Sequence, residues 1–144
     1  MTDLRPFIEK TSELAEALFN PDGQMLAYVH AAHAGKTFLF VCPMGPEDEQ
    51  PFRLGIPARL KSIGCERWCF FTEAWAAEYV VADGVQTLPR DRADRMELVT
   101  FCAEARDGTT LAASRQILRL PGAPAKLMPL VFAQRPPRYV MASS

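Results

Sequence analysis

The stretch CERWCFFTEAWAAEYVV, residues 65–81, is the most hydrophobic part of this chain, and it contains a carboxylate at Glu73. A lone buried charge is costly, so a carboxyl group among aromatic and aliphatic side chains either pairs or becomes protonated. Three roles are open to Glu73. It can be the acid of an active site, the partner of a buried arginine, or an edge residue that faces water.

Two further polar residues, Glu104 and Arg115, lie within apolar runs on either side of Asp107-Gly108. If these two residues form a two-residue hairpin loop, Glu104 and Arg115 share one face of the hairpin. A strand at 66–75 that pairs with this hairpin would bring Glu73 to them. The candidate polar cluster is therefore Glu73, Glu104 and Arg115. We expect an ion pair that fixes the strand register, with Arg115 as the first choice of partner for Glu73. The functional alternative is a carboxylate in a cleft, and no catalytic residue is assigned.

Cysteine and histidine spacing does not predict a metal site. Cys65 and Cys69 are four residues apart, which is about 13 Å on a strand, whereas two thiolates on one zinc lie within about 4 Å of each other. His30 and His33 would point to opposite faces of a strand. Gly35-Lys36-Thr37 imitates the end of a phosphate-binding loop, but the glycine that must precede it is missing. We expect no metal and no cofactor.

Composition excludes several classes of protein. The net charge is −1 and the pI is about 6.1, so the chain has no basic footprint for nucleic acid. Neither a signal peptide nor a run of about 18 apolar residues is visible, so we expect a cytoplasmic protein without a membrane span. The four cysteines are expected to be buried thiols rather than disulfides. A Cys–His catalytic pair stays possible, although nothing local marks one thiol as activated.

Hydrophobic periodicity and turn residues predict the elements that position these groups. We expect a helix over 3–19, two strands within 24–42 around a turn at 33–36, a helix over 57–63, a strand over 66–75 and a hairpin over 96–120. The alanines of 24–33 also suit a helix, and so does the spacing of aromatic residues in 65–81. Residues 43–51 are predicted to be an acidic loop, and residues 82–95 a polar loop whose arginines and aspartates balance.

These elements predict one α+β domain with a mixed or antiparallel sheet of about five strands and helices on one face. The domain covers residues 1–120, and residues 121–144 form a Pro-rich extended C-terminal arm of the same domain, with five of the twelve prolines. The arm carries many apolar side chains. Extended arms of this kind commonly add to a sheet edge or lie across a neighbour. We therefore expect a homodimer formed through the arm or a sheet edge; the alternative is that the arm wraps its own domain.

The motifs FFTEAW, Pro89-Arg90-Asp91-Arg92, DRMELVTFCAEARDG and SRQILR resemble those of a set of uncharacterised bacterial proteins. In that set, a strand ending in a motif similar to SEAW precedes a Pro-rich polar loop and a hairpin with an Asp-Gly turn. The resemblance covers residues 65–119, with Thr72 in place of the usual serine. It implies the strand and the hairpin, and it carries over no catalytic residue.

Two functions remain as predictions. The leading one is a small cytoplasmic, non-enzymatic binding or assembly protein that acts as a homo-oligomer. The alternative is a small-molecule-binding protein or enzyme that uses the carboxylate–arginine cluster.

Overall fold

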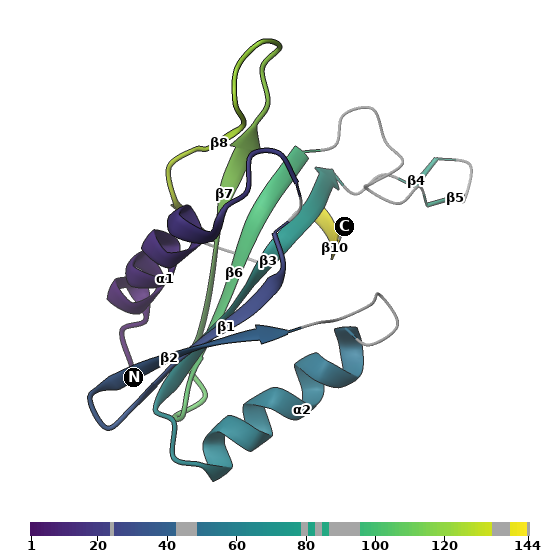
Figure 1. The fold of residues 1–144 in the computed structure, drawn as a ribbon. Helices are drawn as coiled ribbons and strands as arrows, with labels where there is room; N and C mark the ends of the chain where they lie inside the picture. Colours follow the sequence, from purple (N-terminus) through teal and green to yellow (C-terminus); the bar gives the residue numbers. More distant parts are fainter. Residues whose placement is uncertain are drawn as a thin grey trace.

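The structure is a computed structural model that describes residues 1–23, 25–42, 49–78, 81–82, 85–86, 96–133 and 139–143. It has two helices and ten strands in these ranges (Figure 1). The helices are α1 (Arg5–Leu18) and α2 (Glu49–Ser62). The strands are β1 (Ala27–His33), β2 (Lys36–Cys42), β3 (Arg67–Glu78), β4 (Val81–Ala82), β5 (Val85–Gln86), β6 (Met96–Ala105), β7 (Thr110–Leu118), β8 (Lys126–Leu127), β9 (Val131–Phe132) and β10 (Tyr139–Ser143).

The predicted first helix is α1. Its proline lies in the first turn, where a missing N–H costs no helical hydrogen bond. Phe7, Ile8, Thr11 and Ala15 recur at helical spacing and are buried against the sheet. A stripe with this spacing is what the sequence predicts, and it holds the helix to the core.

Residues 27–42 form a β-hairpin, so the strand alternative for 24–33 is the correct one. Ala34 and Gly35 form its two-residue loop, and both have positive φ, 52° and 76°. This combination gives a type I′ turn, whose twist matches that of paired strands. The ladder then runs without interruption from His33↔Lys36 to Ala27↔Cys42.

The strand over 66–75 is also confirmed, as β3, and it is the centre of the sheet. The strand order is β2-β1-β3-β6-β7-β8, with β10 also beside β3 and β9 also beside β7. All of these pairings are antiparallel. The sheet has eight strands rather than five, because three short strands of the C-terminal arm join it.

The hairpin β6–β7 forms as predicted, but its register differs by one residue. The loop is Arg106-Asp107-Gly108: the N–H of Ala105 donates to the Thr109 carbonyl at 2.8 Å, and Gly108 has φ of 90°. A three-residue loop that ends in left-handed glycine is the next commonest hairpin loop. Glu104 therefore pairs with Thr110 instead of Leu111. A shift of one residue moves every β7 side chain to the opposite face.

The two helices cover opposite faces of the sheet, which corrects the expectation that both cover one (Figure 1). Residues of α1 pack with Tyr28, Phe71 and Phe101, and we call this side the α1 face. Leu60 of α2 packs with the alternate residues Val29 and Trp68, on the α2 face. The central strands are apolar on both sides, and this two-sided burial is what their composition predicts.

The second helix begins earlier than predicted. It starts at Glu49, so Pro57 lies inside it rather than in its first turn. Residues 49–51 of the predicted acidic loop are thus helical, and residues 43–48 lie outside the described residues. The predicted polar loop at 82–95 also lies mostly outside them; of this region, the structure describes the pairing of β4 with β5.

The C-terminal arm packs on its own domain. Strands β8 and β9 pair with the outer edge of β7, and β10 pairs with the second half of β3. Leu127 of β8 is buried beside Ile117. The arm is therefore part of the sheet in these places, as the alternative from sequence had it.

Candidate functional site

Glu73 is a buried carboxyl group with a main-chain partner. The Glu73 side chain lies on the α1 face, and Glu73 as a whole is 6% exposed. Oε1 accepts the N–H of Met25 at 3.0 Å. Burial raises the pKa of Glu73, while the bond from Met25 and the charge of Arg119 act in the opposite direction. The carboxyl group thus anchors the segment that enters β1, and its burial favours the neutral form relative to an exposed glutamate.

Arg115 is in the same row of the sheet as Glu73, with Val99 of β6 between them. Its guanidinium pairs instead with Glu16 of α1 at 2.8 Å, and its Nε donates to the Met128 carbonyl at 2.7 Å. Nη1 also lies 3.4 Å from the Ser12 carbonyl. Arg115 therefore joins α1 and the arm to β7, which is a structural role.

Glu104 is on the other face of the sheet. It is partly exposed, and its carboxylate lies 3.9 Å from Nζ of Lys61 in α2. The structure therefore does not bring the three residues of the predicted cluster together. Glu73 and Arg115 share the α1 face without pairing, and Glu104 is on the α2 face. Two registers separate them. The longer β6–β7 loop reverses the facing of β7 and so moves Arg115 away from the face of Glu104. The pairing of β3 with β6, in which Glu73 opposes Val99, puts Glu73 on the face opposite Glu104.

A buried polar network not predicted from sequence lies under α1. His30 and Cys69 are direct partners across β1 and β3. The His30 ring stacks on Phe7 with 4.5 Å between ring centres, and its Nδ1 is 2.8 Å from Oγ1 of Thr11. Oγ1 of Thr11 also donates to the Phe7 carbonyl at 2.9 Å, which leaves its oxygen able to accept a hydrogen bond from His30.

This network contains a cysteine and a histidine, but it has the wrong electrostatics for nucleophilic catalysis. Cys69 is fully buried, and burial raises the pKa of its thiol far above the usual range. Burial, with Lys10 nearby, lowers the pKa of His30. Both groups are therefore neutral near pH 7, whereas a nucleophilic cysteine needs an accessible thiolate. No sequence motif signals this contact, because it depends on the packing of α1 over β1.

The outer edge of β2 is the most unusual surface of the described residues. Phe38, Leu39, Phe40 and Val41 are consecutive and are 42%, 40%, 44% and 52% exposed. Phe38 and Phe40 stack side by side, with ring centres 6.4 Å apart. β2 stands at the end of the strand order, and in the described part of the chain no strand pairs with its outer side (Figure 1). We call this surface the β2 edge.

An apolar groove lies beside the β2 edge, between β2 and α2. Its volume is about 380 Å³, and its lining includes Phe40 and Val41 from β2 and Ile56, Leu60 and Ile63 from the α2 region. Ile63 is itself 56% exposed. The only charged residue of the lining is Arg59. The edge and the groove together form one apolar surface.

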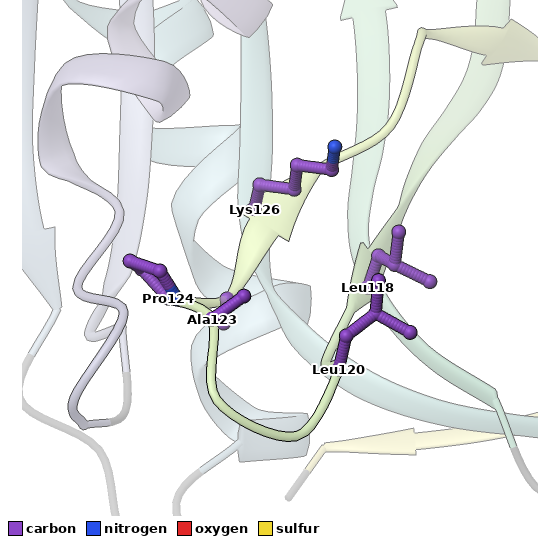
Figure 2. A pocket seen from close by; sticks show the side chains of 6 residues that line it. Leu118, Leu120, Ala123, Pro124 and Lys126 are labelled. Carbon is purple, nitrogen blue, oxygen red and sulfur yellow. The ribbon is translucent and has the colours of Figure 1, made fainter.

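A second hollow, of about 340 Å³, lies between the end of β7 and the start of β8. Figure 2 shows Leu118 and Leu120 on one side and Ala123, Pro124 and Lys126 on the other. Lys126 supplies its one charged side chain. Its lining offers neither a nucleophile nor an acid–base pair, so we assign it no chemistry.

The remaining cysteines and histidine are dispersed. Cys42 and Cys65 are buried, and Cys102 is exposed rather than buried as predicted. Nδ1 of His33 lies 2.8 Å from the Gly64 carbonyl. Among the residues that the structure describes, no three His, Cys, Asp or Glu side chains gather as metal ligands, and no helix is long and apolar enough to cross a membrane.

No family model, no curated protein and no solved structure matches this chain. The resemblance over residues 65–119 therefore stays a prediction. The candidate functional site is the β2 edge with its groove, because it combines four consecutive exposed apolar residues with an outer side that no described strand pairs.

Proposed function

We propose that this protein is a non-enzymatic assembly module that acts as a homo-oligomer, and that the β2 edge is its contact surface. The observation that carries the proposal is the run of four exposed apolar residues on an edge strand. Edge strands with unpaired N–H and C=O groups are templates for a further strand, and proteins that stay monomeric usually protect them with charges, prolines or bulges. β2 has one charge, at Lys36, and neither a proline nor a bulge.

The contrast between the two sides of the sheet supports this assignment. The β7 edge is paired by β8 and β9, so the arm that we expected to reach a neighbour is occupied within its own domain. The β2 edge has no such partner in the described residues. Of the two routes to self-association expected from sequence, the sheet edge is the one we propose.

The distribution of polar groups supports a non-enzymatic role. An enzyme that uses Glu73, Glu104 and Arg115 needs a pocket that contains all three, but these residues lie on two faces. Each also has a partner of its own, in Met25, Lys61 and Glu16 respectively. We therefore prefer assembly to catalysis.

Native mass spectrometry of the purified protein tests the proposal. The wild-type chain is expected to be a dimer or a larger species. Leu39→Lys places a charge on the β2 edge and is expected to give a monomer with an unchanged circular dichroism spectrum. Val131→Lys is the matched control, because Val131 is an exposed apolar strand residue away from β2. A wild-type monomer at about 100 µM, a concentration well above the dissociation constant of a micromolar dimer, would overturn the proposal.

A further inference from the structure

We propose that two copies join by pairing β2 with β2 in antiparallel orientation, about a two-fold axis that passes through Leu39. This inference rests on the proposed self-association and specifies its partner and register. The argument follows from the hydrogen-bond pattern of the hairpin, from the overlap of the two strands and from the side chains that they bring together.

The hairpin determines which main-chain groups of β2 face outward. In a two-residue loop, the closing pair His33↔Lys36 exchanges hydrogen bonds, and every second pair after it does the same. The next pair, Ala32↔Thr37, is then not hydrogen-bonded within the hairpin. In agreement, the Ala32 carbonyl points away from β2 and accepts the N–H of Glu66 at 2.9 Å. The outward N–H and C=O groups of β2 therefore belong to Thr37, Leu39 and Val41.

These outward groups restrict how two β2 strands can pair. In an antiparallel ladder, hydrogen-bonded residues oppose hydrogen-bonded residues, so the odd-numbered residues of one copy must oppose odd-numbered residues of the other. A two-fold axis must then pass through a residue and not between two residues. An axis through Leu39, the middle residue of Lys36–Cys42, overlaps all seven positions of the strand. It also lets all three outward residues bond, because Thr37 then opposes Val41 of the second copy.

The side chains of this register are complementary. On the α2 face, Phe38 opposes Phe40 of the second copy, in the pair type that brings side chains closest. The stacked rings of the two copies then form one aromatic cluster beside the α2 groove, whose lining includes Phe40. Lys36 of each copy opposes Cys42, so the two lysines stand about 20 Å apart and do not repel each other strongly.

Cysteine cross-linking tests the register. In a Cys102→Ser background, which removes the exposed thiol, each of Thr37, Leu39 and Val41 is replaced singly by cysteine. Leu39→Cys is expected to form a covalent dimer under mild oxidation, because directly opposed residues have Cα atoms about 5.5 Å apart, within disulfide range. Thr37→Cys and Val41→Cys alone are expected to stay uncoupled, since each residue lies about 14 Å from the same residue of the second copy. A mixture of these two variants is expected to cross-link.

The outcomes separate this inference from the function on which it rests. A native dimer in which Thr37→Cys or Val41→Cys couples alone, or in which Leu39→Cys does not couple, overturns the register and leaves the assembly proposal standing. A monomeric Cys102→Ser parent overturns both. Both the register and the assembly proposal are supported if Leu39→Cys cross-links, if the mixture of Thr37→Cys and Val41→Cys cross-links, and if neither of these last two variants cross-links alone.

Discussion

At the scale of single residues, Glu73 has a structural role. The carboxyl group is buried and accepts a main-chain N–H from Met25, so it does not need an arginine beside it. Arg115 is used elsewhere, between α1 and the arm. Residue types alone suggested that the two would pair, because a buried carboxylate and a half-buried arginine are complementary. The backbone supplied the partner of Glu73 instead.

The raised pKa of Glu73 predicts a pH-dependent effect of Glu73→Gln. The folded-state pKa of Glu73 lies above the ordinary value of 4.5, which represents the unfolded chain. At a pH between the unfolded and the folded pKa, the native protein therefore binds more protons than the unfolded chain. Wild-type stability is therefore lost as the pH rises through this window. Glutamine keeps an oxygen for Met25 and carries no charge. We expect the free energy of unfolding of the variant to rise relative to wild type from about pH 4 to pH 7, measured by urea denaturation.

Glu13→Gln is the matched control for this series, because Glu13 is exposed on α1. The explanation would be wrong if Glu73→Gln were less stable than wild type at pH 7. In that case the attraction of Arg119 would outweigh the cost of burial.

At the scale of elements, turn geometry decides which side chains meet. Asp107-Gly108 correctly predicts a hairpin, but the loop has three residues, and this one additional residue separates Glu104 from Arg115. The N–H of Thr109 donates to Oδ1 of Asp107 at 2.9 Å, which stabilises the longer loop. Both loop lengths are common, and the choice between them depends on contacts of the folded strands.

The same substitution at two glycines is expected to have opposite effects. Gly108 has φ of 90°, while Gly55 lies inside α2, and a Cβ at either position meets no atom within 4 Å. Gly108→Ala is expected to lower the free energy of unfolding by about 1 kcal/mol, because alanine resists positive φ. Gly55→Ala is expected to raise it by about 0.5–1 kcal/mol, because it reduces the entropy of the unfolded chain. Urea denaturation measures both; a loss of stability in Gly55→Ala would contradict this assignment.

At the scale of the whole molecule, the arm and the β2 edge are complementary features. The arm covers the outer edge of β7 with β8 and β9, and its β10 pairs with the second half of β3, on the side of β3 that also carries β1. In the described residues, β2 keeps exposed apolar side chains and an outer edge that no strand pairs. We therefore expect the arm to contribute to stability, and the β2 edge is the surface that we propose for assembly.

Leu127→Ala tests the contribution of the arm to the fold. Leu127 is buried next to Ile117, so its truncation is expected to cost about 2–3 kcal/mol of the free energy of unfolding. Leu120→Ala, in the exposed turn before β8, is expected to change it by less than about 0.5 kcal/mol. If thermal or urea denaturation showed an effect of Leu127→Ala as small as that of Leu120→Ala, the arm would contribute little to stability.

The sequence by itself determined the α+β class, the first helix and the β6–β7 hairpin, because these depend on local periodicity and on turn residues such as Asp107-Gly108. For residues 24–33 and 65–81 it left strand and helix open, and strand pairing in the sheet decided for the strand. Only the tertiary structure decided the loop length that put Glu104 and Arg115 on opposite faces, the opposite placement of the two helices and the return of the arm to its own sheet. Those features depend on contacts between residues far apart in the chain, which local patterns do not encode. The exposure of Phe38–Val41 belongs to the same group: their composition predicts a strand, and only the strand order makes that strand an edge.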